Sequence, residues 1–206
     1  MYVPEHFAVT DPGLLAGAMR EFPFATIVTG GTEPIASHVP LVFEPAHPPL
    51  GKLTGHLARA NPQWRQWTDA SEALVIFQGP HAYISPDWYV NQQAVPTWNY
   101  VAVHAYGRIT LVNDGPRLDA LMGELTSRFE AGAGPGLSDA EKSYRQRMLG
   151  GIIGFEIAIT RLDGKFKLSQ NRPPEDVAGV IAALENSAEP GDRQTAEWMR
   201  RFARPR

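Results

Sequence analysis

Residues 99–112 read NYVAVHAYGRITLV, the clearest β-strand signal in the chain. Val101 and Ile109 fall on one face of this run, and His104 and Tyr106 fall on the other, as expected for a strand with one buried face. Working outward, the sequence predicts five further strands, at residues 24–29, 35–43, 50–57, 74–77 and 152–162. About six strands in mostly sequential order, with short helices around them, favour a mainly β antiparallel barrel (α+β) over a doubly wound sheet.

Helices are expected between and after these strands. Asp11-Pro12 has the N-cap and first-turn residues of a helix that ends before Pro23. Further helices are predicted near residues 62–68, 118–129 and 138–149, and two more follow Pro173-Pro174 and Asp192. We therefore predict a barrel domain over residues 1–172, with residues 173–206 as a helical extension packed on it.

Two proline-containing regions carry specific expectations. Pro40, inside the strand predicted at 35–43, indicates an edge or a bulge there. Residues 78–97 contain several prolines and aromatic residues and are predicted to be irregular. A loop of this length in a compact domain usually has a function.

Composition limits the classes of function. The 206 residues include 43% hydrophobic residues and no cysteine, so a real core is expected while disulfides and thiolate chemistry are excluded. The net charge is −3, which disfavours broad charge-driven binding to nucleic acid but leaves a local basic patch open. No apolar run is long enough to span a bilayer and the N-terminus lacks signal-peptide features, so we expect a soluble cytoplasmic protein.

Residues 164–172 read GKFKLSQNR and follow the predicted strand at 152–162. They combine three cationic side chains with amides and a hydroxyl, a set that suits an anionic ligand, of which phosphate is the commonest. The alternative is a solvated hairpin end, because short basic clusters usually face water.

Three other polar clusters lie at or beside predicted strands. They are Ser37-His38, Thr54-Gly55-His56 with Arg59 and Asn61, and Trp98-Asn99 with His104. Each alone is also typical of a structural residue, but together they fit a phosphate-bearing, ring-shaped cofactor. Arg59 and a lysine would suit the phosphate, with Thr54 or Ser37 donating hydrogen bonds.

Other kinds of site have less support. The six histidines show no metal-ligand spacing, so no metal is expected, and neither a Gly-x-Ser-x-Gly elbow nor a dinucleotide-type glycine turn occurs. No catalytic residue can be named from the sequence. Five aromatic residues are suited either to lining the pocket of a ring-shaped cofactor or to a contact in the core or at a dimer interface. They are Tyr83, Trp88, Tyr89, Trp98 and Tyr100.

The chain resembles the PaiB-like family, described as FMN-binding negative transcriptional regulators. The matching segments span about residues 1–185 and include 22–26, 37–41, 55–62, 77–86, 95–100, 104–107 and 164–172. The resemblance implies a flavin-reductase-like split β-barrel, related to pyridoxamine-phosphate oxidases, that works as a homodimer with FMN in clefts at the subunit interface. The sequence departs from the family at residues 131–136, AGAGPG, where an aromatic-bearing segment is usual.

The resemblance also implies roles for individual residues. Ser37, His38 and Val39 would lie beside the isoalloxazine ring, with Thr54, His56, Arg59 and Asn61 toward the phosphate. Lys167, Ser169 and Gln170 would close the cleft from the partner chain. Asn99 and His104 complete the predicted cofactor-binding set.

Two functions of different classes follow. The first is an FMN-binding regulator that acts through binding; the alternative is an FMN-dependent oxidoreductase in which His104 or Tyr106 assists proton transfer. Direct DNA binding is possible but not supported by charge, since the arginines at 200, 201, 204 and 206 resemble a solvated tail. Another flat ligand, such as pyridoxal phosphate or a porphyrin, is a third possibility.

Overall fold

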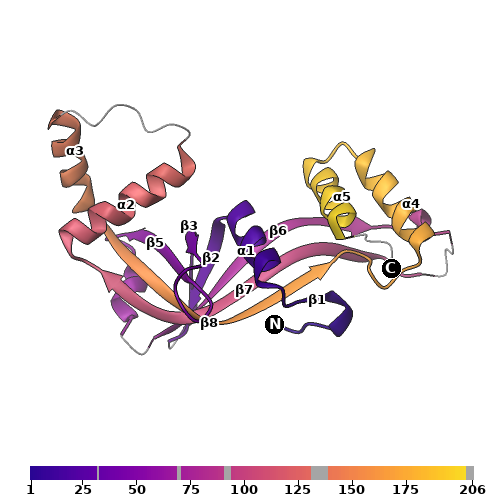
Figure 1. The fold of residues 1–206 in the computed structure, drawn as a ribbon, viewed down its shortest axis with the longest axis horizontal. Coiled ribbons are helices and arrows are strands. Elements are labelled where there is room, and N and C mark those ends of the chain that lie inside the picture. The colour runs from indigo at the N-terminus through magenta and orange to yellow at the C-terminus, as the bar shows by residue number, and fades with distance from the viewer. Residues whose placement is uncertain (32, 69–70, 91–93, 131–138, 203–206) are drawn as a thin grey trace. The chain divides into compact units, whose positions relative to one another are not determined.

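The computed structural model describes residues 1–206 except 32, 69–70, 91–93, 131–138 and 203–206 (Figure 1). The chain forms two compact units. The first unit contains residues 1–21, 78–103 and 163–206, and the second contains residues 22–77 and 104–162. Three long strands contribute to both units: β6 (Glu72–Ile84), β7 (Thr97–Val112) and β8 (Ile152–Lys167).

The sheet contains eight strands within the described residues, in the order β3-β2-β6-β7-β8-β5-β4, with β1 (Ala8–Val9) paired to β8. In the second unit, β2 (Phe24–Thr29) pairs antiparallel with β3 (Ile35–Pro40) and with β6. On the other side, β5 (Lys52–Ala58) pairs antiparallel with β4 (Val42–Glu44) and with β8. Ile27, Leu53 and Phe155 are fully buried in this unit, as their alternation along the strands requires.

The prediction of six strands is therefore wrong in number, although the mainly antiparallel class is confirmed. The run predicted at 35–43 divides into β3 and β4 at Leu41, whose N–H donates to the Pro23 carbonyl at 2.9 Å. Pro40 ends β3, in keeping with the break expected at a proline. The short β1 accounts for the other additional strand.

Two predicted boundaries are also wrong. Residues 78–84 continue β6, so the irregular segment starts later than expected, and a 3-10 turn covers Pro86–Trp88. Strand β8 extends beyond residue 162 to Lys167. The lysines of the 164–172 segment therefore lie on a strand and not on a hairpin end.

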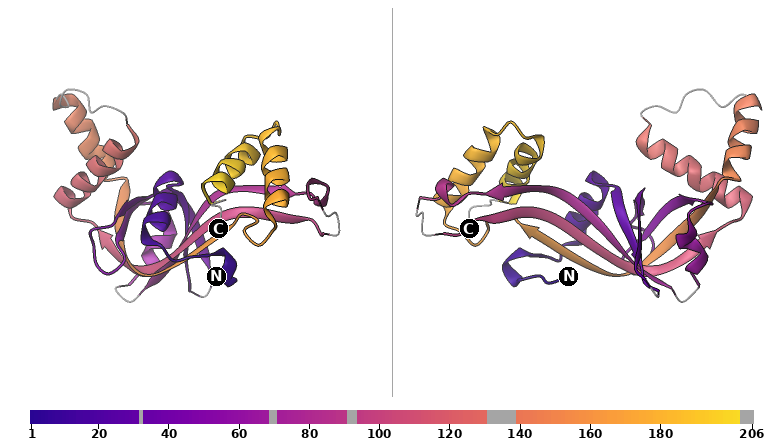
Figure 2. Two further views of the ribbon diagram at one scale, coloured as in Figure 1. Left: turned by 45° about the vertical axis from the view of Figure 1, so that its right-hand side comes forward. Right: turned by 180° about the vertical axis from the view of Figure 1, so that it is seen from behind.

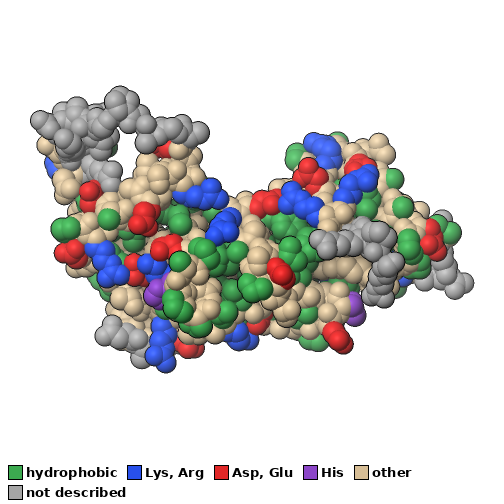
Figure 3. Space-filling model, in the orientation of Figure 1, with side chains coloured by type: hydrophobic (Ala, Val, Ile, Leu, Met, Phe, Trp, Pro, Cys, Tyr) green, Lys and Arg blue, Asp and Glu red, His purple; other side chains and the backbone are tan. Residues whose placement is uncertain are grey.

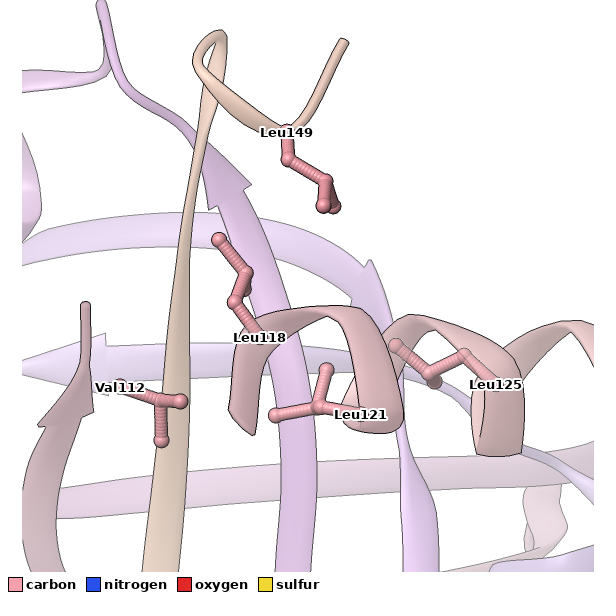
Figure 4. Packing of buried hydrophobic residues seen from close by; sticks show 5 residues of the cluster. All are labelled: Val112, Leu118, Leu121, Leu125 and Leu149. Atoms are coloured by element: carbon pink, nitrogen blue, oxygen red, sulfur yellow. The ribbon is translucent and has the colours of Figure 1, made fainter. Parts of the chain in front are cut away.

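A leucine cluster attaches the helices of the second unit to its sheet. Asp114 caps α2 (Gly115–Phe129) by accepting a hydrogen bond from the Arg117 N–H at 3.0 Å. Leucines at three- and four-residue spacing on α2 then pack on the end of β7 and on α3 (Asp139–Leu149) (Figure 4). The cluster consists of Val112, Leu118, Leu121, Leu125 and Leu149. Residues 131–136, where the sequence departs from the PaiB-like family, lie outside the described residues.

The first unit contains the remaining helices. Asp11 caps α1 (Pro12–Glu21), accepting from the Leu14 N–H at 2.8 Å as predicted. The tail helices α4 (Pro174–Glu185) and α5 (Pro190–Phe202) lie side by side (Figures 1 and 2). Phe166 of β8 packs edge-on against two rings of α5, so within this unit α5 covers the strand. The domain boundary at residue 172 stays a prediction. None of the helices in the described ranges is long and apolar enough to cross a membrane.

Candidate functional site

The second unit contains eight of the twelve predicted cofactor-binding residues. They are Ser37, His38, Val39, Thr54, His56, Arg59, Asn61 and His104. The first unit contains the other four, Asn99, Lys167, Ser169 and Gln170.

Ser37 and Asn61 are joined directly. The Asn61 Nδ2 donates to the Ser37 Oγ at 2.9 Å, and the Asn61 Oδ1 accepts from the Gln63 N–H at 2.9 Å. The second bond makes Asn61 the N-cap of the 3-10 turn Pro62–Gln66, which fixes the direction of its amide. This turn brings a hydroxyl and an amide together beside β3.

His38 and Val39 point to opposite faces of β3. His38 is exposed. Its Nδ1 forms a hydrogen bond with the Thr26 hydroxyl at 2.9 Å, and its ring stacks on the Phe24 ring at a centroid distance of 6.3 Å. Val39 is buried. A ligand beside this strand would therefore meet the His38 side chain and the backbone of Val39.

Thr54 and Arg59 already have partners within the protein. Thr54 is buried, and its hydroxyl lies 3.4 Å from Glu44 Oε1 and 3.5 Å from the Val42 carbonyl. The Arg59 Nε donates to the Gly150 carbonyl at 2.9 Å, and its Nη2 donates to Asn113 Oδ1 at 3.1 Å. Arg59 thus connects β5 to the segment after α3 and to the end of β7.

His56 carries a buried Nδ1 for which the described residues offer no hydrogen-bond partner. Burial lowers the pKa of His56 from its ordinary value of 6.5, so the imidazole is neutral at neutral pH. A neutral ring nitrogen suits a hydrogen bond to a ring or hydroxyl group better than it suits charge pairing with a phosphate.

His104 lies on β7 beside Tyr106, with the ring centroids 6.4 Å apart. The Arg161 guanidinium stacks over the Tyr106 ring, 3.6 Å from its centroid. The two candidates for assisting proton transfer are therefore neighbours in the second unit.

In the first unit, Asn99 and Ser169 form a buried pair. The Asn99 Nδ2 donates to the Ser169 Oγ at 2.9 Å and also contacts the Met199 sulfur at 3.4 Å. Ser169 has φ of 65°, a left-handed conformation that costs a non-glycine residue about 1 kcal/mol or more. The Gln170 amide then closes the turn, donating to the Phe166 carbonyl and accepting from the Leu168 N–H. These three side chains shape the turn that follows Lys167.

Lys167 donates to the Thr97 hydroxyl and, at 2.7 Å, to the Trp98 carbonyl. Burial is the main cause that lowers its pKa from 10.5, followed by the positive charges of Lys165 and Arg172. The site prediction did not include Lys165 or Arg172. Their signal was present in the sequence, because residues 164–172 gather three cationic side chains. The structure adds that Lys165 and Lys167 are two positions apart on β8 and so share a face.

The described residues contain no group of three or more acidic, histidine or cysteine side chains arranged to hold a metal ion. A cavity of about 510 Å³ lies between α1 and α5 in the first unit. Two of its charged groups are paired with each other: Glu21 accepts from Arg201 at 2.8 Å and also from the Trp198 indole N–H at 3.0 Å.

Each unit contains donors that fit part of FMN chemically. The second unit has the Ser37 hydroxyl, the Asn61 amide and an unpartnered ring nitrogen at His56, and the first unit has an ammonium group at Lys167 that suits a phosphate. Residues 1–161 match the family model described as "Putative FMN-binding domain". The chain is also 40% identical, over 97% of its length and 96% of the relative, to the "Protease synthase and sporulation protein PAI 2" of Bacillus subtilis.

Solved structures show the same fold at low sequence identity. The flavocytochrome Anf3 from Azotobacter vinelandii matches with a TM-score of 0.63 and 12% identity, covering 86% of this chain and 78% of that one. The FAD and heme binding protein from Mycobacterium smegmatis matches with a TM-score of 0.55 and 16% identity, covering 83% and 78%. The chain therefore belongs to the FMN-binding domain family that the PaiB-like resemblance indicated, its fold is the flavin-reductase-like split β-barrel, and its cofactor is FMN.

Proposed function

We propose that this protein is a cytoplasmic, homodimeric regulator that binds FMN at the interface between its two copies and acts through binding. The twelve residues predicted from the sequence remain the candidates for contacts with the cofactor. The regulatory part is supported by the resemblance to the PaiB-like transcriptional regulators and by the Bacillus subtilis relative, whose name describes it as a sporulation protein.

The proposed dimer interface is inferred from a pair of exposed aromatic rings in the first unit. Tyr83 on β6 and Trp98 on β7 are 45% and 52% exposed, and their ring centroids are 6.1 Å apart. Exposed aromatic side chains that lie together are typical of protein interfaces and ligand walls. The backbone carbonyl of Trp98 also accepts from Lys167, so the rings adjoin a predicted cofactor contact.

Charge supports regulation by a route other than broad DNA binding. On the face drawn in Figure 3, the described Lys and Arg side chains are interspersed with Asp and Glu. Arg200 and Arg201, near the C-terminus, pair with Glu185 and Glu21. We expect no gel retardation of duplex DNA at low salt; retardation with a steep salt dependence would instead indicate direct phosphate contacts.

The stack of Arg161 over Tyr106, with His104 beside it, favours the FMN-dependent oxidoreductase as a second candidate. A held phenol and imidazole are groups that can exchange a proton with a substrate. Bleaching of the bound-flavin absorbance by NADH or NADPH, faster than that of free FMN, would favour this alternative over the regulator.

The proposal is tested by purifying the protein, denaturing it to identify the released chromophore, and measuring its mass by light scattering. We expect one FMN per chain and the mass of two chains. Tyr83→Ser with Trp98→Ser should weaken dimerisation by about tenfold or more, as expected when interface aromatic anchors are lost. Tyr144→Ser, which removes a similarly exposed ring on α3, is the matched control and should change nothing. A single-chain mass for the wild type, or a protein that takes up no FMN, would contradict the proposal.

A further inference from the structure

Strand β8 separates aromatic from cationic side chains as it passes through the first unit. Phe166 faces α5, where it meets the rings of Trp198 and Phe202 at centroid distances of 5.4 and 5.2 Å. Because side chains alternate along a strand, Lys165 and Lys167 point to the other face. The two ammonium groups therefore lie on the face of β8 opposite to the helix.

Lys165 is only 8% exposed. Its Nζ donates to the Tyr2 carbonyl at 3.1 Å and lies 5.4 Å from the Tyr2 ring centroid and 5.3 Å from that of Tyr100. The two rings stabilise the positive charge through cation–π interactions but accept no strong hydrogen bond. An ammonium group has three donors, so two N–H groups of Lys165 have no acceptor among the described residues.

Lys167 and Arg172 extend this group of cations. Lys167 uses two donors on Thr97 and Trp98, which leaves one. The Arg172 guanidinium stacks on Tyr89, 4.6 Å from the ring centroid, and its side chain meets no hydrogen-bond acceptor within the ranges that the structure describes. The charges of Lys165 and Arg172 both act on Lys167 and lower its pKa, after the effect of burial.

No carboxylate in the described part of the chain forms an ion pair with any of these three cations. Asp163, two residues before Lys165 on β8, has its Oδ2 2.9 Å from the Met1 ammonium. Lys165 is buried, and Lys167 and Arg172 are partly buried. Holding positive charges together without an anion is costly under these conditions, so the cluster is well suited to an anionic ligand. The other cation proposed for phosphate, Arg59, already donates to two protein acceptors.

We propose that Lys165, Lys167 and Arg172 hold the FMN phosphate and thereby select FMN over riboflavin. This inference rests on the proposed binding of FMN and moves the phosphate role away from Arg59. The terminal oxygens of a phosphate accept several hydrogen bonds, which matches the donors that these three side chains leave unused. Arg59 then serves to connect β5 with the segment at Gly150.

The test is the ratio of FMN affinity to riboflavin affinity, measured by fluorescence titration of the flavin-free protein. The two flavins differ only in the phosphate, so the ratio isolates the phosphate contacts from those of the ring. Lys165→Met and Lys167→Met should each lower the ratio by about tenfold or more, the loss expected for a charged hydrogen bond. Riboflavin affinity should stay near the wild-type value, which also reports that the variants are folded.

Three controls sharpen the result. Lys167→Arg keeps the charge and should keep most of the preference for FMN. Lys52→Met removes one positive charge that is paired with Glu44 and Glu156, and Arg59→Met removes one engaged with protein acceptors. Lys52→Met should not change the ratio by more than about twofold, the size of a screened long-range effect. Arg59→Met tests the competing assignment of the phosphate to Arg59, and the inference expects it to lower the ratio less than Lys167→Met does.

The outcomes separate the two proposals. If the wild type binds neither flavin, the proposed function fails and the inference fails with it. If the wild type prefers FMN and both lysine variants keep that preference, the inference alone is overturned. A loss of preference in Arg59→Met equal to that in Lys167→Met would also overturn it, because the phosphate would then lie at Arg59.

Discussion

Lys52 and Lys167 are both strand lysines in partly buried positions, and they differ in what surrounds them. In the second unit, the Lys52 ammonium lies 3.1 Å from Glu156 and 3.4 Å from Glu44, and Arg117 completes the network on Glu156. In the first unit, Lys167 has a hydroxyl, a carbonyl and two further cations as its neighbours. Burial lowers the pKa of both lysines, but at Lys52 the carboxylates outweigh burial and raise it above 10.5.

The difference separates two uses of a buried positive charge. A cation whose counter-charge comes from the same chain contributes to the fold, and its removal leaves carboxylates poorly paired. A cation without such a partner costs the fold stability and contributes to binding when an anion arrives. The two lysines therefore predict opposite results for the same substitution.

The largest effect should come from Lys52→Met. Loss of its ion pairs with Glu156 and Glu44 should lower the free energy of unfolding by about 1–2 kcal/mol, since the pair is partly shielded from water. Lys167→Met should raise the free energy of unfolding of the flavin-free protein, because it removes a desolvated charge beside two others. Urea denaturation of both variants measures this. Equal destabilisation by both would remove the distinction between the two regions.

The turn that follows Lys167 gives the next effect. Ser169→Ala should cost about 1–2 kcal/mol, since it removes the oxygen partner of the buried Asn99 amide and keeps a side chain at the left-handed position 169. Ser169→Gly loses the same hydrogen bond but relieves the backbone, so it should cost about 1 kcal/mol less. Denaturation curves for both variants check this order. If the glycine variant is no more stable than the alanine variant, the left-handed conformation at position 169 does not cost the protein stability.

The pH dependence of stability should have opposite signs for the two lysines. Between the lowered pKa of Lys167 and 10.5, the unfolded chain binds more protons at this residue than the folded one, so its contribution to the free energy of unfolding rises with pH. The contribution of Lys52 is fully present below 10.5 and is lost as pH rises through its raised pKa. Subtracting each methionine variant's curve from that of the wild type isolates the two slopes. Slopes of the same sign would contradict the comparison.

The sequence predicted the elements whose signals are local. The Asp11 cap, the alternation of residues 99–112 and the leucine spacing of α2 all depend on neighbours within a few positions, and all are confirmed. Residues 78–84 were predicted to be irregular because residues 78–97 contain several prolines and aromatic residues. The pairing of β2 with β6 ends at Ile76, so Pro80 lies in a part of β6 beyond that pairing.

The candidate site was predicted less completely, because its properties depend on distant partners. Lys52 and Glu156 are 104 positions apart, and Lys167 and Thr97 are 70 apart. A sequence pattern over a few positions does not show which of the two lysines has a carboxylate as its partner in the fold. For the same reason, the sequence indicated Arg59 as a phosphate ligand, whereas its acceptors at Gly150 and Asn113 emerge only in the fold.

The smallest expected effect on stability is that of His56, which tests whether the imidazole in the second unit is uncharged in the folded protein. Its pKa is lowered by burial, so the folded state binds fewer protons than the unfolded one just below pH 6.5 and loses stability as pH falls through that window. His56→Gln should lose less stability than the wild type between pH 7.5 and 5.5, by up to about 1 kcal/mol. Urea denaturation at the two pH values checks it. An equal loss in both proteins would mean that the imidazole is not desolvated.

The most direct measurement is a crystal structure of the protein with FMN bound. The account predicts phosphate oxygens within about 2.7–3.2 Å of the Lys165 and Lys167 ammonium groups, with the Arg172 guanidinium turned toward them. The bonds of Arg59 to Gly150 and Asn113 should be unchanged. A phosphate held by Arg59, with Lys165 and Lys167 making no contact to the cofactor, would contradict the account.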